Sequence, residues 1–378
     1  MRFGKITLMA AALAVALTAC GRGDEEFTDA TPNMDGLALE ISNQVAEGVT
    51  VQGLEGQSSQ GVATVPEYLQ AARTAVRELN AMLRRELEPV VSLIAQRGTI
   101  EPGQARVYGP KDQDGATWRL GIKRIEVNKY AWRLDAKPIG ADDTAYLIIM
   151  GGGMARGVEA HRGRGVVGVN LDNLKLVLGD AFAGQGKMLA AFAHVENAAG
   201  TLEAKSLAYL LHGFTPDATQ HDPVDAAFVG HKLLPSGATG IRLLAKVNIG
   251  ATATTAKETV ALRVRWIPGT GGAGAIRAWG GDIPEGTWYR GFACWDAQEM
   301  EGFKALASCT LNATTGLPEC SPVQGYPVGQ LSNCRPGTGE ADVVPPEMSD
   351  VVSTTPEAGA PSTDPLTVPS DVPSGDGF

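Results

Sequence analysis

The sequence lacks several features that would assign it to a class at once. Its N-terminal apolar run, Ile6–Ala16, has 11 residues, well short of the roughly 20 that a membrane-spanning helix needs. It also lacks an excess of positive charge: the net charge is −10, so we predict no nucleic-acid partner. Close cysteine pairs are absent too, because the last four cysteines are separated by 15, 11 and 14 residues. This spacing argues against a zinc site.

Catalytic motifs are also missing. No GxSxG nucleophile elbow occurs, and the acidic residues are too numerous for the sequence to pair two of them as acid and base. Gly151–Gly157 follows the apolar run Ala145–Met150, which superficially suggests a dinucleotide-binding turn. The chain from there to Val166 is too short and too rich in glycine for a crossover helix. We therefore predict a glycine-rich loop between strands, no cofactor and no enzymatic activity.

The N-terminal residues are typical of an exported protein. Arg2 and Lys5 precede the apolar run and small residues follow it, as at a signal-peptide cleavage site. The stretch Leu17-Thr18-Ala19-Cys20 resembles the lipobox of bacterial lipoproteins. The resemblance covers residues 1–20 and carries no information about the rest of the chain.

This resemblance implies an anchored protein. Residues 1–19 would be removed as a signal peptide, and Cys20 would carry a diacylglycerol and an amide-linked acyl chain such as palmitate. Two or three acyl chains hold a protein stably at a membrane. Gly21 stands where an Asp retains many lipoproteins at the inner membrane, which favours the outer membrane. The expected location is the bacterial cell envelope.

An exported protein meets an oxidising compartment, so the four remaining cysteines predict two disulfides. They allow three connectivities. Cys309 and Cys320 flank the turn-like stretch Asn312–Gly316, which favours their pairing across a hairpin. That pairing would join Cys294 to Cys334, and the other connectivities stay open.

Composition divides the mature chain into three parts. Residues 20–63 are rich in Gly, Ser, Gln and acidic residues, as expected of a membrane tether. Residues 64–334 form the predicted globular domain, with a disulfide-bonded segment at about 294–334. Residues 335–378 contain one arginine and eight acidic residues and show no periodicity, so we expect a disordered acidic tail.

The clearest helix is predicted over residues 65–97. Thr64 and Glu67 match a capping box, Pro89 predicts a kink, and Gly98 supplies a stop. Apolar residues recur at steps of three and four, which predicts one buried face: Leu69, Ala72, Val76, Leu79, Leu83, Leu87, Val90 and Ile94.

From about residue 105 to 295 the apolar period changes to two, which predicts strands with one buried face. Runs that are apolar on both faces indicate central or helix-covered strands: Ala145–Met150, Met188–Val195 and Leu207–Leu211. Glycine clusters at 151–153 and 268–274 predict turns, and residues 296–307 suggest a short helix. The predicted fold class is α+β: an N-terminal amphipathic helix packed on a large antiparallel sheet that forms a half-barrel, a barrel or a sandwich.

Histidines and acidic residues gather in two places without compact metal-ligand spacing. His194 and Glu196 share one strand face, and a second group follows Phe214. We predict no metal site and interpret these as solvated polar groups. The second group is His212, His221, Asp222, Asp225 and His231.

Cations alternate with apolar residues on four predicted strands. If these strands are neighbours, they form a basic sheet face able to receive anionic glycans or lipid headgroups; the alternative is a solvated face with scattered charges. The cations are Arg119, Lys123, Arg133, Arg242, Lys246, Arg263 and Arg265. Four tryptophans suit either stacking on sugars or core packing: Trp266, Trp279, Trp288 and Trp295.

The sequence therefore favours a non-enzymatic binding or interaction protein of the envelope, with glycans, lipids or proteins as partners. One alternative is a carrier of a hydrophobic ligand held in a curved sheet, which would be similar in architecture alone to lipoprotein-localisation carriers. Another is a hydrolase of envelope polymers.

Overall fold

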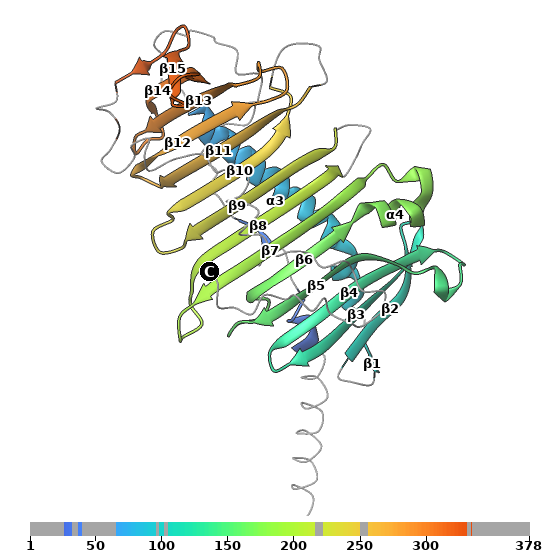
Figure 1. Cartoon of the computed structure of the whole chain (residues 1–378). Coiled ribbons are helices and arrows are strands. Elements are labelled where there is room, and N and C mark those ends of the chain that lie inside the picture. The colour runs from blue at the N-terminus through green and yellow to red at the C-terminus, as the bar shows by residue number, and fades with distance from the viewer. Residues whose placement is uncertain are drawn as a thin grey trace, which may run out of the picture.

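The fold is a long antiparallel sheet with few helices, seen in a computed structural model of the chain (Figure 1). The structure describes residues 26–31, 37–39, 66–95, 98–101, 105–215, 222–249, 256–330 and 334. The predicted signal peptide, Cys20, His221 and the predicted tail lie outside these residues. None of the described helices is long and apolar enough to cross a membrane.

Neighbouring strands in the sheet are neighbours in sequence, from β1 to β15, and β16 pairs with β14. The path is open, with β1 and β15 at its ends, so the described strands form neither the closed barrel nor the sandwich among the predicted alternatives. The strands are β1 Thr99–Glu101, β2 Ala105–Gln113, β3 Ala116–Glu126, β4 Lys129–Pro138, β5 Leu147–Arg156, β6 Gly163–Asn170, β7 Gln185–Glu196, β8 Leu202–Thr215, β9 Val224–Leu233, β10 Thr239–Val247, β11 Glu258–Ile267, β12 Gly271–Trp279, β13 Thr287–Trp295, β14 Glu301–Leu311, β15 Pro318–Pro322 and β16 Val328–Gly329.

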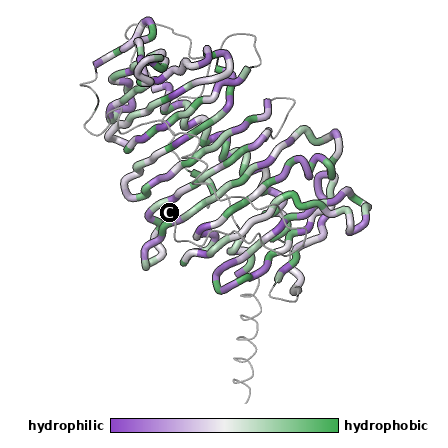
Figure 2. Tube along the Cα trace, viewed as in Figure 1, coloured by the Kyte–Doolittle hydropathy of each residue, from purple (hydrophilic) through white to green (hydrophobic). Residues whose placement is uncertain are grey.

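Short turns make this meander possible. Asp114 and Gly115 form the two-residue loop between β2 and β3, with φ angles of 52° and 84°. Positive φ at both central positions is the requirement of a type I′ hairpin, whose twist matches that of the strands. Figure 2 shows hydrophilic residues at many of these turns and hydrophobic residues along the central strands.

Helix α3, Glu67–Ile94, lies along one face of the sheet, which we call the inner face. All eight residues of the predicted stripe belong to the main core, and six of them are buried. The helix begins after Pro66 without a side-chain cap and ends at Ile94, with Ala95 as its C-cap, and Pro89 lies inside it. The capping-box prediction involves Thr64, which is outside the described residues.

The two ends of α3 reach opposite ends of the sheet. At its start, Glu67 forms an ion pair with Lys304 of β14 at 2.6 Å. Near its end, Ser92 donates to Gln113 of β2 at 2.7 Å. A helix of 28 residues is about 42 Å long. The twelve strand spacings from β2 to β14 would cover about 58 Å if the sheet were flat. The sheet must therefore twist and curve around the helix.

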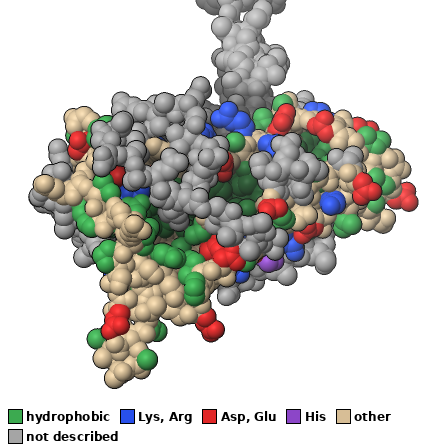
Figure 3. Space-filling model, turned by 90° about the horizontal axis from the view of Figure 1, so that it is seen from above, with side chains coloured by type: hydrophobic (Ala, Val, Ile, Leu, Met, Phe, Trp, Pro, Cys, Tyr) green, Lys and Arg blue, Asp and Glu red, His purple; other side chains and the backbone are tan. Residues whose placement is uncertain are grey.

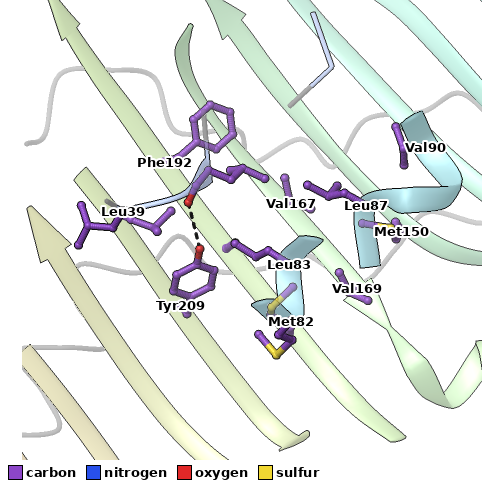
Figure 4. Close-up of a cluster of buried hydrophobic side chains, with 14 of the residues drawn as sticks. Leu39, Met82, Leu83, Leu87, Val90, Met150, Val167, Val169, Phe192 and Tyr209 are labelled. Atoms are coloured by element: carbon purple, nitrogen blue, oxygen red, sulfur yellow. Dashed lines mark hydrogen bonds between the residues drawn. The ribbon is translucent and has the colours of Figure 1, made fainter. Parts of the chain in front are cut away.

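The inner face is filled by the protein's own side chains. In Figure 4, Leu83 and Leu87 of α3 lie against Val167 and Val169 of β6. Hydrophobic side chains also gather in the middle of the view from above (Figure 3). The short helix α4, Leu171–Leu178, packs against β4, β5 and β7. The 3-10 turns η1 and η2 span Asp143–Ala145 and Gly179–Ala181.

Two stretches of the predicted tether, 26–31 and 37–39, belong to the folded core. Phe27, Leu37 and Leu39 are buried. The Tyr209 hydroxyl donates to the Leu37 carbonyl at 3.3 Å (Figure 4). Asn80 of α3 exchanges two hydrogen bonds with the backbone of Leu39, at 3.0 and 3.3 Å. These two stretches are therefore part of the folded core and not of a solvated tether.

Three local predictions are wrong in whole or in part: of the cluster 268–274, predicted as a turn, residues 271–274 lie in β12. The glycine cluster 151–153 lies inside β5 and is not a loop. Glycine is needed there because a Cβ at Gly152 would collide with the Val166 carbonyl and lie 3.3 Å from the Trp132 ring. The predicted helix at 296–307 is instead a turn at 296–300 followed by the first residues of β14. Asp296 accepts from the backbone N–H groups of Gln298 and Met300, both at 2.9 Å, so its carboxylate closes a turn.

The favoured disulfide pairing, one of the three possible connectivities, is present in the structure. Cys309 and Cys320 are cross-strand partners on β14 and β15. Cys294 of β13 pairs with Cys334.

Candidate functional site

The cations predicted to form one face all lie on the outer face of the sheet, opposite α3, but they fall into two groups. Arg119, Lys123 and Arg133 are on β3 and β4, whereas the other four are on β10 and β11. Strands β5 to β9 separate the groups. Six strand spacings from β4 to β10 amount to roughly 29 Å, so the seven residues do not form one continuous patch.

The group on β3 and β4 is organised around a carboxylate. Asp135 is buried and forms ion pairs with Arg119 at 3.0 Å and Arg133 at 2.7 Å. The Arg119 guanidinium also lies 4.0 Å from the centre of the Tyr146 ring. These contacts fix both arginines, and the carboxylate offsets one of their two charges, so we interpret them as structural.

The group on β10 and β11 extends onto β12 and β13. We call the whole set the arginine–tryptophan patch. Strand alternation places all its members on the outer face, because the intervening residues Leu262 and Val264 belong to the inner core and Ala261 and Ala275 to smaller outer clusters. The members are Arg242, Lys246, Arg263, Arg265, Arg277, Trp279, Trp288 and Arg290.

Like charges face each other directly in this patch. Arg242 is the cross-strand partner of Arg263, and Arg277 is the cross-strand partner of Arg290. Like charges directly opposite each other destabilise a sheet. The outward positions on the described residues of β10 to β13 include six cations and no Asp or Glu. The patch therefore concentrates positive charge on a protein whose net charge is −10.

Two aromatic rings lie beside the cations. Trp279 and Trp288 are cross-strand partners. The Arg277 guanidinium lies 5.5 Å from the first ring and 5.1 Å from the second, within the range of cation–π attraction. The other two tryptophans, Trp266 and Trp295, are buried in the inner core. The four tryptophans thus divide equally between packing and the outer surface.

His231 of β9 lies at the edge of the patch. Its ring occupies the space above Gly240, where a Cβ would collide with it. Partial burial, together with the charges of Arg242, Arg263 and Arg265, lowers the pKa of His231 below its usual 6.5. Burial is the larger cause and the three arginines add to it, so the protonated imidazole is unfavourable at this position.

The remaining histidine and acidic candidates are dispersed. His194 accepts from the Gly163 N–H at 3.2 Å, and Glu196 forms an ion pair with Arg162 at 3.3 Å. His212 contacts Asp225 at 3.1 Å. Within the described ranges, no three His, Cys, Asp or Glu side chains come together in a way that could hold a metal ion.

No family model, curated protein or solved structure matches this chain. Arginine side chains donate in pairs to carboxylate, sulfate or phosphate groups, and indole rings offer apolar faces next to them. Arg277 and Arg290 were not among the predicted candidates. The period of two in Ala273, Ala275, Arg277 and Trp279 could have placed Arg277 on one face of a strand.

Proposed function

We propose that this chain is a lipid-anchored protein of the bacterial cell envelope that binds an anionic glycan through the arginine–tryptophan patch, without catalysing a reaction. The observation that carries the proposal is the two pairs of opposed arginines, Arg242–Arg263 and Arg277–Arg290. Like charges directly opposite each other are unfavourable in a sheet, and an anion close to both guanidinium groups would reduce their repulsion.

The aromatic residues favour a glycan over a simple anion. Trp279 and Trp288 lie side by side next to Arg277, so the patch offers flat apolar surface beside its donors. A sugar ring presents an apolar face to stack on an indole, and its acidic substituents match the guanidinium forks. Lipid headgroups share the anionic chemistry and are the competing ligand class.

The location is inferred from the N-terminal sequence. The lipobox resemblance at Cys20 supports anchoring, and Gly21 favours the outer membrane. Two disulfides are consistent with an oxidising compartment. In fold terms we assign the arrangement of α3 on the curved sheet to the α+β class, in a half-barrel form.

A binding measurement on the purified mature protein tests the proposal. The probe is fluorescently labelled dextran sulfate, a sulfated polysaccharide, titrated over a range of NaCl concentrations. We expect the variant Arg263→Ala/Arg277→Ala to bind at least tenfold more weakly, and to depend less steeply on salt, because charge-assisted contacts are lost. Vesicles containing anionic phospholipid, tested in parallel, distinguish a headgroup ligand.

A matched control removes two cations elsewhere. Arg84 on α3 and Lys187 on the outer side of β7 are both exposed, and Arg84→Ala/Lys187→Ala causes the same change in net charge. This control should retain affinity within about twofold. Equal losses in both variants would mean that net charge, and not the patch, governs binding, and the proposal would then be wrong.

The carrier hypothesis remains as a second candidate, because α3 lies against a large curved sheet. The described inner face is occupied by its own side chains, such as Leu83, Leu87 and Tyr209, which weighs against an enclosed ligand. Native mass spectrometry of the mature protein tests it: a co-purifying lipid would support the carrier, and an apo mass would count against it. The hydrolase hypothesis predicts turnover of envelope polymers in an activity screen.

A further inference from the structure

The disulfide Cys294–Cys334 brings the end of the folded domain onto the outer face. Cys294 lies on β13 and faces outward, and Cys334 packs against a small apolar cluster there. The cluster consists of Ala273, Ala275, Phe292, Cys294 and Phe303. Cys334, after which the acidic segment begins, therefore lies on the same face as the arginine–tryptophan patch.

Cys334 lies next to the patch cations. Ala273 and Ala275, which belong to the cluster beneath Cys334, are the cross-strand partners of Arg265 and Arg263. Adjacent strands are about 4.8 Å apart, so Cys294 on β13 lies roughly two spacings from Arg265 on β11. The whole patch extends over β10 to β13, about 15 Å across the strands.

The segment that starts there has the opposite charge. Residues 335–378 contain Arg335 and eight acidic residues, a net charge of −7, against six cations in the patch. The acids are spread along the segment: Glu340, Asp342, Glu347, Asp350, Glu357, Asp364, Asp371 and Asp376. A chain of 44 residues can extend to roughly 145 Å, so its length does not limit contact with any part of the patch.

We propose that the acidic segment 335–378 binds the arginine–tryptophan patch of its own chain and competes there with anionic ligands. Only the competition rests on the proposed function; the intramolecular contact stands on charge and position. The disulfide at Cys334 holds the segment beside its target, and short tethers of this kind give effective concentrations of the order of millimolar. Contacts between exposed charges are individually weak and screened by salt, so a more densely charged polymer displaces the segment.

Three forms of the mature protein test this inference: the full chain, a form lacking residues 336–378, and a full-length form with all eight acids changed to Asn or Gln. The probe is again labelled dextran sulfate. We expect the deleted and neutralised forms to bind it at least tenfold more tightly than the full chain at 50 mM NaCl. The difference should shrink at 500 mM NaCl because screening weakens the intramolecular contact.

A synthetic peptide of residues 336–378 provides the measurement that needs no external ligand. It should bind the deleted form in calorimetry, and Arg263→Ala/Arg277→Ala should weaken that binding by at least fivefold. Arg84→Ala/Lys187→Ala should not. Peptide binding that is absent, or equal in the patch and control variants, would overturn the inference.

The two proposals fail in different ways. Peptide binding at the patch without any binding of dextran sulfate would support the inference and contradict the proposed function. Alternatively, dextran sulfate could bind the patch of the full and deleted forms with equal affinity while the peptide does not bind. That result would support the proposed function and contradict the inference.

Discussion

Arg73 of α3 and Glu299 of the β13–β14 turn form a bidentate ion pair, with nitrogen–oxygen distances of 2.6 and 2.8 Å. The two residues are 226 positions apart, and their side chains are only 11% and 15% exposed. The pair thus fixes the first half of α3 to the last part of the sheet. Glu299 adopts a φ of 61°, which places its carboxylate at the tip of the turn that Asp296 closes.

Removing one partner should therefore destabilise the fold. We expect Arg73→Ala to lower the free energy of unfolding by about 2–3 kcal/mol, somewhat below the cost for a fully buried pair, because a largely desolvated carboxylate loses its partner. Denaturant unfolding measures this, with Arg77→Ala as the control because Arg77 is exposed. In the double variant Arg73→Ala/Glu299→Ala the losses should be clearly less than additive. Additive losses would contradict a direct interaction.

Tyr68 packs so closely on β12 and β13 that it requires glycine beneath it. A Cβ at Gly291 would collide with the Tyr68 hydroxyl and lie 2.8 Å from Ile276. We expect Gly291→Ala to destabilise the fold by about 1–3 kcal/mol, as overpacking does. Gly168→Ala is the matched control, because its Cβ would meet only the Gly151 carbonyl at 3.7 Å. Thermal unfolding should leave the control within about 0.5 kcal/mol of the parent or slightly more stable.

The helix and many strands were predictable because each depends on a local period. The α3 stripe from Leu69 to Ile94 is visible without knowing what covers it, and the structure places it in the core. The alternation on β10 and β11 likewise assigns Arg242 and Arg263 to the face opposite Leu243 and Leu262. Periodicity gives the face of each residue and says nothing of the order of strands in the sheet.

The parts that sequence reasoning missed depend on contacts between distant residues. Arg119 and Arg263 have the same alternating pattern, and nothing in that pattern shows that Arg119 lies beside a buried carboxylate, Asp135. Gly152 was interpreted as part of a turn because the neighbouring Trp132, which needs its space, is 20 positions away. A glycine-rich strand and a glycine-rich loop have the same composition, and tertiary packing decides between them.

The lowered pKa of His231 makes the stability of the fold depend on pH. In the unfolded chain the imidazole takes up a proton near pH 6.5, whereas burial and Arg242, Arg263 and Arg265 hold the folded pKa below that value. Between the two pKa values the unfolded state binds more protons, so stability falls as the pH drops below about 6.5. His231→Gln should remove this part of the pH dependence, and His212→Gln should leave it in place. Urea midpoints between pH 5 and 7.5 measure both.

A bound anion should reverse the same shift. Negative charge beside the imidazolium favours its protonated form, so saturation with dextran sulfate should raise the pKa of His231 in an NMR titration. Affinity should therefore increase as the pH falls. An unchanged His231 titration curve at saturating ligand would place the ligand away from the patch.

Arg242 faces Arg263 across β10 and β11. A substitution that removes one of these charges should therefore stabilise the fold and weaken ligand binding. We expect Arg242→Thr to raise the free energy of unfolding by about 0.5–1 kcal/mol, because it removes a like-charge pair and adds a residue suited to strands. The same variant should weaken dextran sulfate binding several-fold. Lys187→Thr, which removes an exposed cation whose cross-strand partners are Asn170 and His212, should change neither by much. If Arg242→Thr lowered stability, the opposed arginines would be part of the structural framework, and the main physical argument for an anion site on this face would be lost.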